Sequence, residues 1–300
     1  MYRVAQIVLL AVVAWYLFTG FDISKIDLSI FSSLGIILTL SSLLVSQIIL
    51  SLRWMVMSNL SFKISFETIT ISSALNILLP ARLGELSKAF YLKKFYNNNY
   101  NKTISIIFME RFFDIIVLFW IMCYWLYNFF SDTFIKNATI FLAIFILITF
   151  ISLRSKILYH FLKKIPFQFI RVYSQKLYKN INRLLKTPYK ALFYTLLVWF
   201  FYFVSYILFF MYSANFNISY EEMLELFIFS TIALSIPLAP AGIGTFEGAI
   251  VIFLTHHGIS KEDAFMSATI YHILIFAVDF LLLYLILIYK KIHYKDLVKR

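Results

Sequence analysis

The sequence predicts an all-α protein that crosses a membrane several times. Of its 300 residues, 62% are hydrophobic and only 14% are charged, which is far from the usage of soluble domains. Several apolar runs approach or exceed the roughly 20 residues that cross a bilayer core. The runs are continuous rather than alternating, which argues against a transmembrane β-barrel. We therefore expect one membrane domain over residues 1–300, with about six full spans and two broken, re-entrant segments.

The full spans are expected at about 4–20, 30–52, 112–130, 137–153, 191–213 and 264–289. The first has one arginine before it and no clear cleavage site, so we interpret it as a retained span and not as a signal peptide. Two shorter apolar segments, near 67–81 and 223–256, are interrupted by proline and glycine, which cannot continue a straight helix. At membrane depth such a break is tolerated only where it is buried in protein or lines a wet cavity.

The two interruptions share a pattern of Pro-Ala-x-(Leu/Ile)-Gly followed by a glutamate. The helix-breaking residues are Pro80 and Gly84 in the first, and Pro240, Gly242 and Gly244 in the second. One copy in each half predicts an internal repeat with a binding site at its interface. The first repeat would cover about 30–130 and the second about 191–289.

The orientation follows from the basic residues. The connection at 154–190 holds ten Lys and Arg residues and no acidic residue, so it should be cytoplasmic, as should both chain termini. Parity then makes 223–256 enter and leave from the outside. In the first half, the basic residues Arg3, Arg53, Lys63 and those of 88–102 all lie in the cytoplasm if 67–81 enters and leaves from that side, which gives an inverted repeat. In the alternative topology 67–81 is a full span and the N-terminus lies outside, which exposes Arg3, Arg53 and Lys63 externally. Inside 154–190, apolar residues recur at helical spacing between Pro166 and Pro188, which predicts an amphipathic helix on an anionic leaflet of the cell membrane.

Several charged residues are candidates for substrate binding. Arg82, Glu85 and Lys88 would share one broad face of a helix that follows Pro80, and a helix start with an arginine can hold a phosphate. Three further residues open the next span, where they form either an ion-pair network or interfacial charge: Glu110, Arg111 and Asp114.

The second half contributes three more candidates. A carboxylate inside the membrane is expensive, so Glu247 should bind a cationic group, carry a proton or pair with a base such as Arg82 or Arg111. His272 and Asp279 are seven residues apart in the last span and lie on nearly the same helix face. Asp279 is flanked by apolar residues and should face the bundle or a water-filled path.

Composition also limits the partners. The net charge of +12 is explained by cytoplasmic loops and anionic lipid, so we expect no nucleic-acid partner. Cys123 is the single cysteine and the five histidines lack zinc-ligand spacing, so we expect no metal ion and no cofactor. The oligomeric state is left open.

At this point three motifs, taken in order, resemble the transmembrane region of lysylphosphatidylglycerol synthases, a family of flippase-like integral membrane proteins. The resemblance covers roughly residues 29–290. The first motif consists of Asn76, Leu79-Pro80-x-Arg82-x-Gly84-Glu85-Leu86 and Lys88. The second motif is Glu110-Arg111-x-x-Asp114, and the third is Pro240-x-Gly242-Ile243-Gly244-x-x-Glu247. The resemblance implies movement of a charged lipid between leaflets, and related stand-alone proteins are linked with lipid-linked glycans. Nothing here resembles the soluble aminoacyl-transferring domain, so lipid synthesis is not implied.

Two departures from the family pattern bear on the substrate. Lys88 stands where arginine is usual, and Tyr271-His272 where a Tyr-Arg pair is usual. Lysine cannot bind a phosphate in the bidentate manner of arginine, so the head group should differ.

The sequence thus favours translocation of a lipid or lipid-linked head group, carried out by a transporter and not by an enzyme. One alternative is an intramembrane transferase that uses a lipid phosphate donor, with Glu110 and Asp114 as its carboxylates. Another is a non-transporting partner of an enzyme of envelope biosynthesis.

Overall fold

The computed structural model describes residues 31–79, 82–129, 166–184, 188–235 and 239–290, with Thr19, Asp22 and a few positions between 133 and 164. Every regular element among these residues is a helix, so the predicted all-α class is confirmed. Three helices in the described part are long and apolar enough to cross a membrane: Ser33–Ser58, Pro188–Ser213 and Lys261–Lys290. They correspond to the spans predicted at 30–52, 191–213 and 264–289.

Of the other predicted spans, one is part of a longer helix and two lie largely outside the described residues. The span expected at 112–130 is the second part of a longer helix, α5 (Tyr100–Phe129). This helix begins earlier because the Asn99 side chain accepts a hydrogen bond from the backbone N–H of Asn101, 2.9 Å away, which caps the first turn. The spans expected at 4–20 and 137–153 lie largely outside the described residues.

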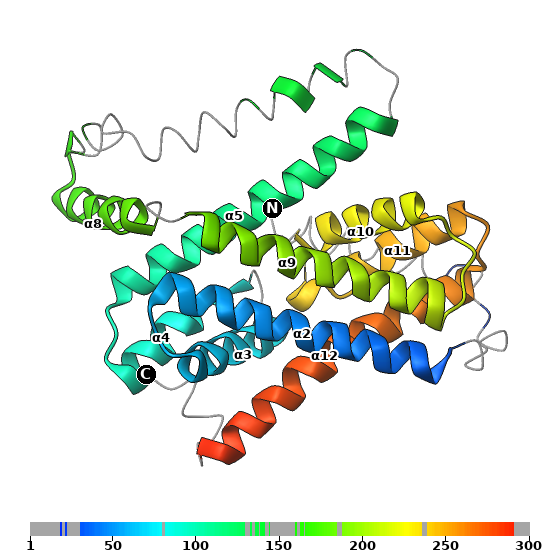
Figure 1. Cartoon of the computed structure of the whole chain (residues 1–300), viewed down its shortest axis with the longest axis horizontal. Helices are drawn as coiled ribbons and strands as arrows, with labels where there is room; N and C mark the ends of the chain where they lie inside the picture. The colour runs from blue at the N-terminus through cyan, green and yellow to red at the C-terminus, as the bar shows by residue number, and fades with distance from the viewer. Residues whose placement is uncertain are drawn as a thin grey trace. The chain divides into compact units, whose positions relative to one another are not determined.

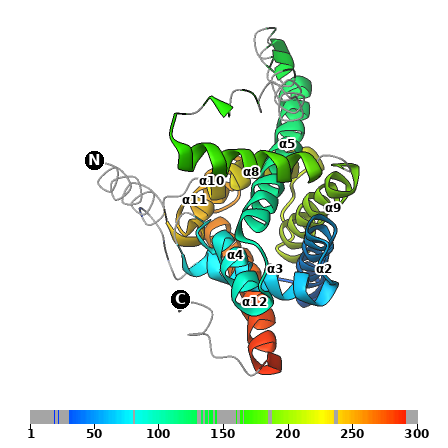
Figure 2. The ribbon, with the colours of Figure 1, turned by 90° about the vertical axis from the view of Figure 1, so that its left-hand side faces the viewer.

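Two of the spanning helices, α2 (Ser33–Ser58) and α9 (Pro188–Tyr206), lie side by side and antiparallel (Figures 1 and 2). Ser42 donates to the carbonyl of Phe201 at 2.8 Å. Beyond Tyr206 the helix continues as a wider π-helical turn, Ile207–Ser213. A Cβ at Gly35 would lie 2.6 Å from the Cα of Ser213, so only glycine permits this approach of the two backbones.

The chain forms two compact units, which we describe separately. The first comprises Met1–Ile48, Ile69–Ser87 and Phe200–Arg300, and the second Ile49–Thr68 and Lys88–Trp199. The core of the first unit is aromatic: Tyr271 packs on Tyr206, Phe209 and Phe210 with ring centroids 4.7, 5.3 and 5.5 Å away. Offset and edge contacts of this kind add to the area that such rings bury.

The first broken segment is a helical hairpin of α3 (Phe62–Leu78) and α4 (Gly84–Tyr96). At its tip, Ser72 donates to the carbonyl of Gly84 at 3.1 Å. At its open end, the buried carboxylate of Glu67 accepts hydrogen bonds from Tyr91 and Tyr96 at 2.9 and 2.6 Å. The two sets of contacts make α3 and α4 antiparallel.

The second broken segment is also a helical hairpin. Helix α10 (Tyr220–Ser235) packs on α11 (Thr245–His256), and a short 3-10 turn, Pro240–Gly242, lies between them. The first turn of α10 and the C-terminus of α11 meet where His257 Nε2 lies 3.5 Å from a Glu222 carboxylate oxygen. Both ends of this segment therefore lie together, as a re-entrant segment requires.

The remaining helices are α8 (Gln168–Leu184) and α12 (Lys261–Lys290). The predicted amphipathic helix corresponds to α8, and α9 begins at the predicted Pro188. Helix α8 packs on α5 and buries Tyr178 and Ile181. Helix α12 packs on α11 and begins at a Ser260 cap that accepts the Asp263 backbone N–H at 3.1 Å.

Candidate functional site

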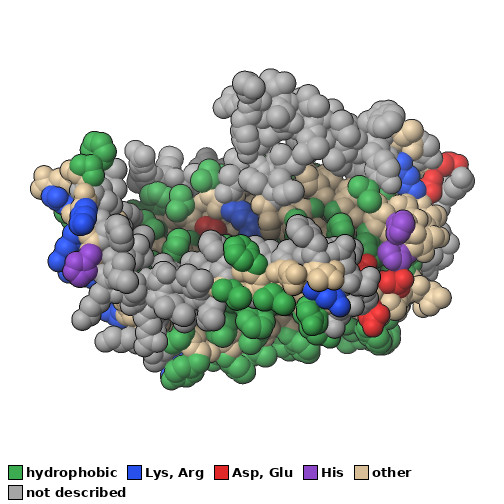
Figure 3. Space-filling model, turned by 90° about the horizontal axis from the view of Figure 1, so that it is seen from above, with side chains coloured by type: hydrophobic (Ala, Val, Ile, Leu, Met, Phe, Trp, Pro, Cys, Tyr) green, Lys and Arg blue, Asp and Glu red, His purple; other side chains and the backbone are tan. Residues whose placement is uncertain are grey.

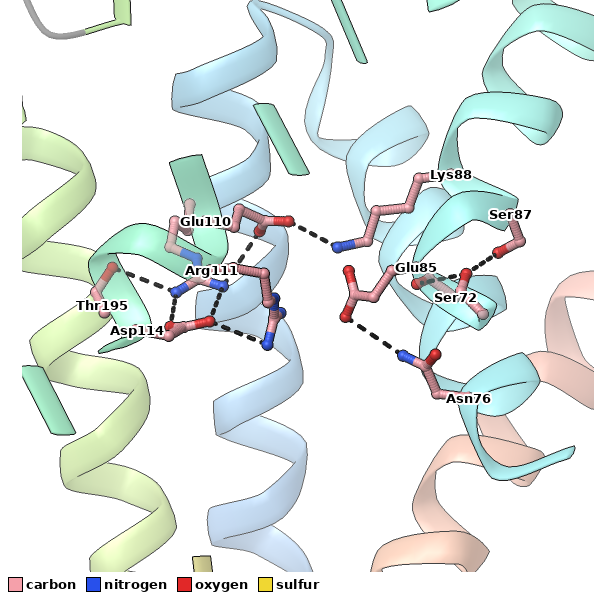
Figure 4. A network of polar contacts seen from close by, with 11 residues as sticks. Ser72, Asn76, Glu85, Ser87, Lys88, Glu110, Arg111, Asp114 and Thr195 are labelled. Carbon is pink, nitrogen blue, oxygen red and sulfur yellow. Dashed lines mark hydrogen bonds and ion pairs between the residues drawn. The ribbon is translucent and has the colours of Figure 1, made fainter. Parts of the chain in front are cut away.

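A network of buried charges lies in the second unit, on α2, α4, α5 and α9. Arg53 is fully buried and contacts Asp114 at 2.5 Å and Glu110 at 3.2 Å. Its guanidinium also donates to the hydroxyl of Thr195 at 3.2 Å. Figure 4 shows Glu110, Asp114 and Thr195 turned toward one another.

Two further cations complete this network. Lys88 is 3% exposed, donates to Glu110 at 2.6 Å and lies 4.8 Å from the centre of the Trp54 ring. Arg111 contacts Asp114 at 3.2 Å, but its side chain is 34% exposed (Figure 4). Two buried carboxylates thus face two buried cations and one half-exposed arginine. Such an arrangement is stable only while every charge keeps its partner.

The network corrects one sequence inference. Because Arg53 directly follows the apolar run at 30–52, the sequence predicts that it lies in a cytoplasmic loop. The structure places it inside α2, fully buried between two carboxylates. It therefore says little about orientation, because its charge is neutralised within the protein.

The first break holds Arg82 and Glu85, but not on a shared helix face. Arg82 has φ of 55° and precedes Gly84, the first residue of α4. The expectation that a single helix presents Arg82, Glu85 and Lys88 together was wrong for Arg82, which is exposed, whereas Lys88 is buried. Glu85 lies in the first turn of α4 and accepts a hydrogen bond from Asn76 Nδ2 at 3.3 Å (Figure 4).

Gly84 is required at this break by close packing. A Cβ on it would lie 2.3 Å from the backbone nitrogen of Asn76 and 2.7 Å from the carbonyl carbon of Leu75. The backbones of α3 and α4 therefore touch at the tip of the hairpin, as only glycine allows. Pro80 lies outside the described residues.

The second break holds Glu247 and His272 in direct contact. Glu247 is in the first turn of α11, and its Oε2 accepts the backbone N–H of Gly244 at 2.7 Å. Its Oε1 lies 2.6 Å from Nδ1 of His272 on α12, and both side chains are buried. From the sequence we expected that a base beside Glu247 would be a residue such as Arg82 or Arg111. In the structure the basic residue that contacts Glu247 is His272. The carboxylate thus caps the start of α11 and also contacts the imidazole of a second helix, α12.

Asp279 and His272 are both buried on α12, as their spacing predicts, but they have different partners. Asp279 accepts a hydrogen bond from the Gln47 side chain of α2. His272 also packs on the rings of Phe246 and Phe276, with centroids 4.6 and 4.3 Å away. The first unit therefore has two separate buried polar pairs along α12.

The backbones of the two breaks agree at one matched position and differ at another. In the alignment that pairs Pro80 with Pro240, Arg82 falls opposite Gly242. Both residues have positive φ, 55° for Arg82 and 75° for Gly242. A non-glycine residue seldom adopts this conformation. The breaks differ at the next matched glycine, because Gly244 has φ of 86° whereas Gly84 is the first residue of helix α4, so an internal repeat stays a prediction.

Sequence reasoning missed three residues that form these pairs: Arg53, Gln47 and Glu67. Each lies within an apolar run or at its edge. The neighbouring residues in the sequence do not show that such a polar side chain pairs with a residue of a distant helix. The signal that was present is an ionisable residue within or next to a spanning segment, which suggests a paired or functional group. Among the described residues, no group of three His, Cys, Asp or Glu side chains is placed to hold a metal ion.

The surface charges are grouped. Figure 3 shows Lys and Arg side chains gathered over α8, which carries Arg171, Lys176, Lys179 and Arg183. Acidic side chains gather around the first turns of α10 and α12, which carry Glu221, Glu222 and Asp263 (Figure 3). These are the segments that the sequence assigns to the cytoplasm and to the outside, respectively.

Comparison with known proteins agrees with the motifs. The sequence profile of the lysylphosphatidylglycerol synthase transmembrane region matches residues 3–282. A UPF0104 membrane protein of Methanocaldococcus jannaschii is 24% identical over 216 residues, which is 67% of this chain and 87% of that protein. No solved structure gives a significant match. The chain is therefore a multi-pass membrane protein that belongs to the family of the lysylphosphatidylglycerol synthase transmembrane region.

Proposed function

We propose that this protein moves a lipid or lipid-linked head group across the cytoplasmic membrane. The observation that carries the proposal is the pair of helical hairpins. Each has a backbone break with a positive φ at the second residue after its proline, and each has a glutamate in the first turn of the helix that follows. Broken helices whose ends meet near the midplane form the binding sites of many transporters.

The proposed path for the head group uses the polar pairs of the first unit. Glu247 and His272 form one polar contact site for the head group, and Asp279 and Gln47 form a second. Each site includes one residue of α12, His272 or Asp279. The acyl or prenyl chains stay in the lipid while the head group moves along this polar line. The exposed Arg82 at the other break is placed to attract a phosphate.

The charge network of the second unit has a different proposed role. Because Glu110 and Asp114 are already neutralised by Arg53 and Lys88, we propose that they hold α2, α4 and α5 together rather than bind substrate. The same pairing argues against an intramembrane transferase, since these carboxylates were its only candidates.

Reconstitution of the purified protein into liposomes tests the proposal. Fluorescent lipids with anionic, zwitterionic and cationic head groups are placed in both leaflets, and a membrane-impermeant quencher measures how fast inner-leaflet lipid becomes accessible. We expect faster exchange of at least one lipid class than in protein-free vesicles. Unchanged exchange for every class, by a protein that is folded in the same vesicles, contradicts a flippase that acts alone and favours the partner alternative.

Glu247→Gln separates transport from folding. Glutamine still accepts the Gly244 N–H, so the helix cap survives, while the negative charge beside His272 is lost. We expect exchange to stop and the protein to remain folded. Glu221→Gln is the matched control, because Glu221 is an exposed glutamate in the first turn of the same hairpin and this variant should exchange lipid normally. Normal exchange by Glu247→Gln refutes the site.

A further inference from the structure

A polar pocket in the second unit is not used by the proposed translocation path. Its volume is about 150 Å³, and it lies between the end of α2, the start of α5, the end of α8 and the start of α9. Engineered cavities of about this volume bind benzene, so the pocket has room for a phosphate group and a few further atoms. Its walls combine apolar side chains with Asn59, Lys102, Asn180 and Arg183.

The polar side chains of the pocket are all able to donate hydrogen bonds. Lys102 uses one donor on the Ser58 carbonyl, 2.9 Å away. In the described part of the chain, no hydrogen bond or ion pair joins the side chains of Asn59, Asn180 and Arg183 to another side chain, so their donors can bind a ligand. No acidic residue is among the lining residues. Two cations and two amides without a carboxylate favour an anion.

We propose that this pocket binds the phosphate group of an anionic ligand, independently of the translocation path. The basic surface of α8 adjoins it, and sequence orientation places this end of the protein in the cytoplasm, where anionic lipid head groups are abundant. A lipid phosphate would insert its charge between Lys102 and Arg183, and its glycerol would contact the apolar wall at Leu184. A soluble phosphate has the same chemistry and is distinguished by experiment.

Binding is measured on the full-length protein in neutral detergent micelles. One titration adds phosphatidylglycerol, a second adds inorganic phosphate, and both are followed by the rise in melting temperature. We expect a saturable rise in at least one titration. A rise with the lipid alone identifies a lipid head group, and a rise with inorganic phosphate identifies a soluble anion. No rise in either overturns the proposal.

Matched variants test the location of the site. Lys102→Gln/Arg183→Gln removes two charges from the pocket, whereas Lys176→Gln/Lys179→Gln removes two charges from α8 at residues that do not line it. We expect binding by the pocket variant to be at least about tenfold weaker than binding by the α8 variant, because both variants lose the attraction of two cations but only the pocket variant loses charge-assisted hydrogen bonds to the phosphate. Equal weakening of both variants overturns the proposal.

Arg183→Gln alone covers the case in which the loss of Lys102 disturbs folding. Lys102 holds the Ser58 carbonyl, but Arg183 is exposed at the end of α8 and its removal leaves that contact in place. We expect this variant to melt at the wild-type temperature without ligand and to bind several-fold more weakly. Unchanged affinity in a folded Arg183→Gln protein contradicts the assignment of Arg183 to the site.

Discussion

The charge network predicts an unusually large effect for the substitution Glu110→Gln. Glu110 is fully buried and accepts from both Arg53 and Lys88. Glutamine has nearly the same size, but it takes from Lys88 the carboxylate 2.6 Å away and from Arg53 one of its two carboxylate partners. Removal of one member of a buried ion pair costs about 3–5 kcal/mol. We therefore expect the free energy of unfolding to fall by about that amount.

The assay is equilibrium unfolding in mixed micelles, with the helix content followed by circular dichroism. Arg111→Gln is the matched control, because Arg111 contacts the same Asp114 but is half-exposed. An exposed ion pair contributes about 0–1 kcal/mol, so this variant should unfold close to the wild type. If Glu110→Gln is as stable as Arg111→Gln, the buried network does not form and the reasoning is refuted.

Three further predictions concern the hairpins. At the first break, Arg82→Gly should be about 1 kcal/mol more stable than Arg82→Ala, since both remove the side chain but only glycine adopts positive φ freely; equal stability contradicts the left-handed turn. At the second, Gly242→Ala should lower stability, as the new Cβ would lie 2.7 Å from Leu234 Cδ1, and thermal unfolding measures the loss. Finally, hydrogen bonds from Ser219 lower the pKa of Glu222, so its contribution to stability exists at neutral pH and is lost as pH falls below about 4. The wild type and Glu222→Gln should therefore have the same free energy of unfolding in acid. A difference between them that does not change with pH contradicts the role of the Ser219–Glu222 hydrogen bond.

The two hairpins could be predicted because proline and glycine act locally. Pro240, Gly242 and Gly244 interrupt an apolar run wherever the surrounding helices lie, and the structure breaks the helix there. The close approach of α3 and α4 at Gly84 could not be predicted, because it depends on which residue of the partner helix faces the glycine. Sequence patterns located the breaks but did not indicate how tightly they pack.

The partners of the charged residues were harder to predict. Glu247 and His272 were both candidates, yet their 2.6 Å contact depends on how α11 packs on α12. Arg53 was missed because an arginine at the end of an apolar run looks the same in sequence whether it faces water or a carboxylate 61 positions further along the chain. Pairing of this kind is decided by tertiary packing.

Helix α8 illustrates a similar ambiguity. Its apolar stripe and its bounds followed from residue spacing and from Pro166 and Pro188. The structure packs the helix on α5 and buries Tyr178 and Ile181 there. An apolar stripe has the same spacing whether it faces lipid or protein, so contact of its basic face with an anionic leaflet stays a prediction.

We predict that the two hairpins enter the membrane from opposite faces. Labelling of single cysteines with a membrane-impermeant maleimide in intact cells tests it directly, in a Cys123→Ala background. Exposed positions at the open ends of the hairpins are Ser61 and Asn97 for the first, and Asn217 and Ser260 for the second. We predict that Asn217→Cys and Ser260→Cys label from outside, whereas Ser61→Cys and Asn97→Cys label only after permeabilisation. If the two positions of either hairpin label from opposite sides, or if all four label from the same side, the inverted arrangement is contradicted.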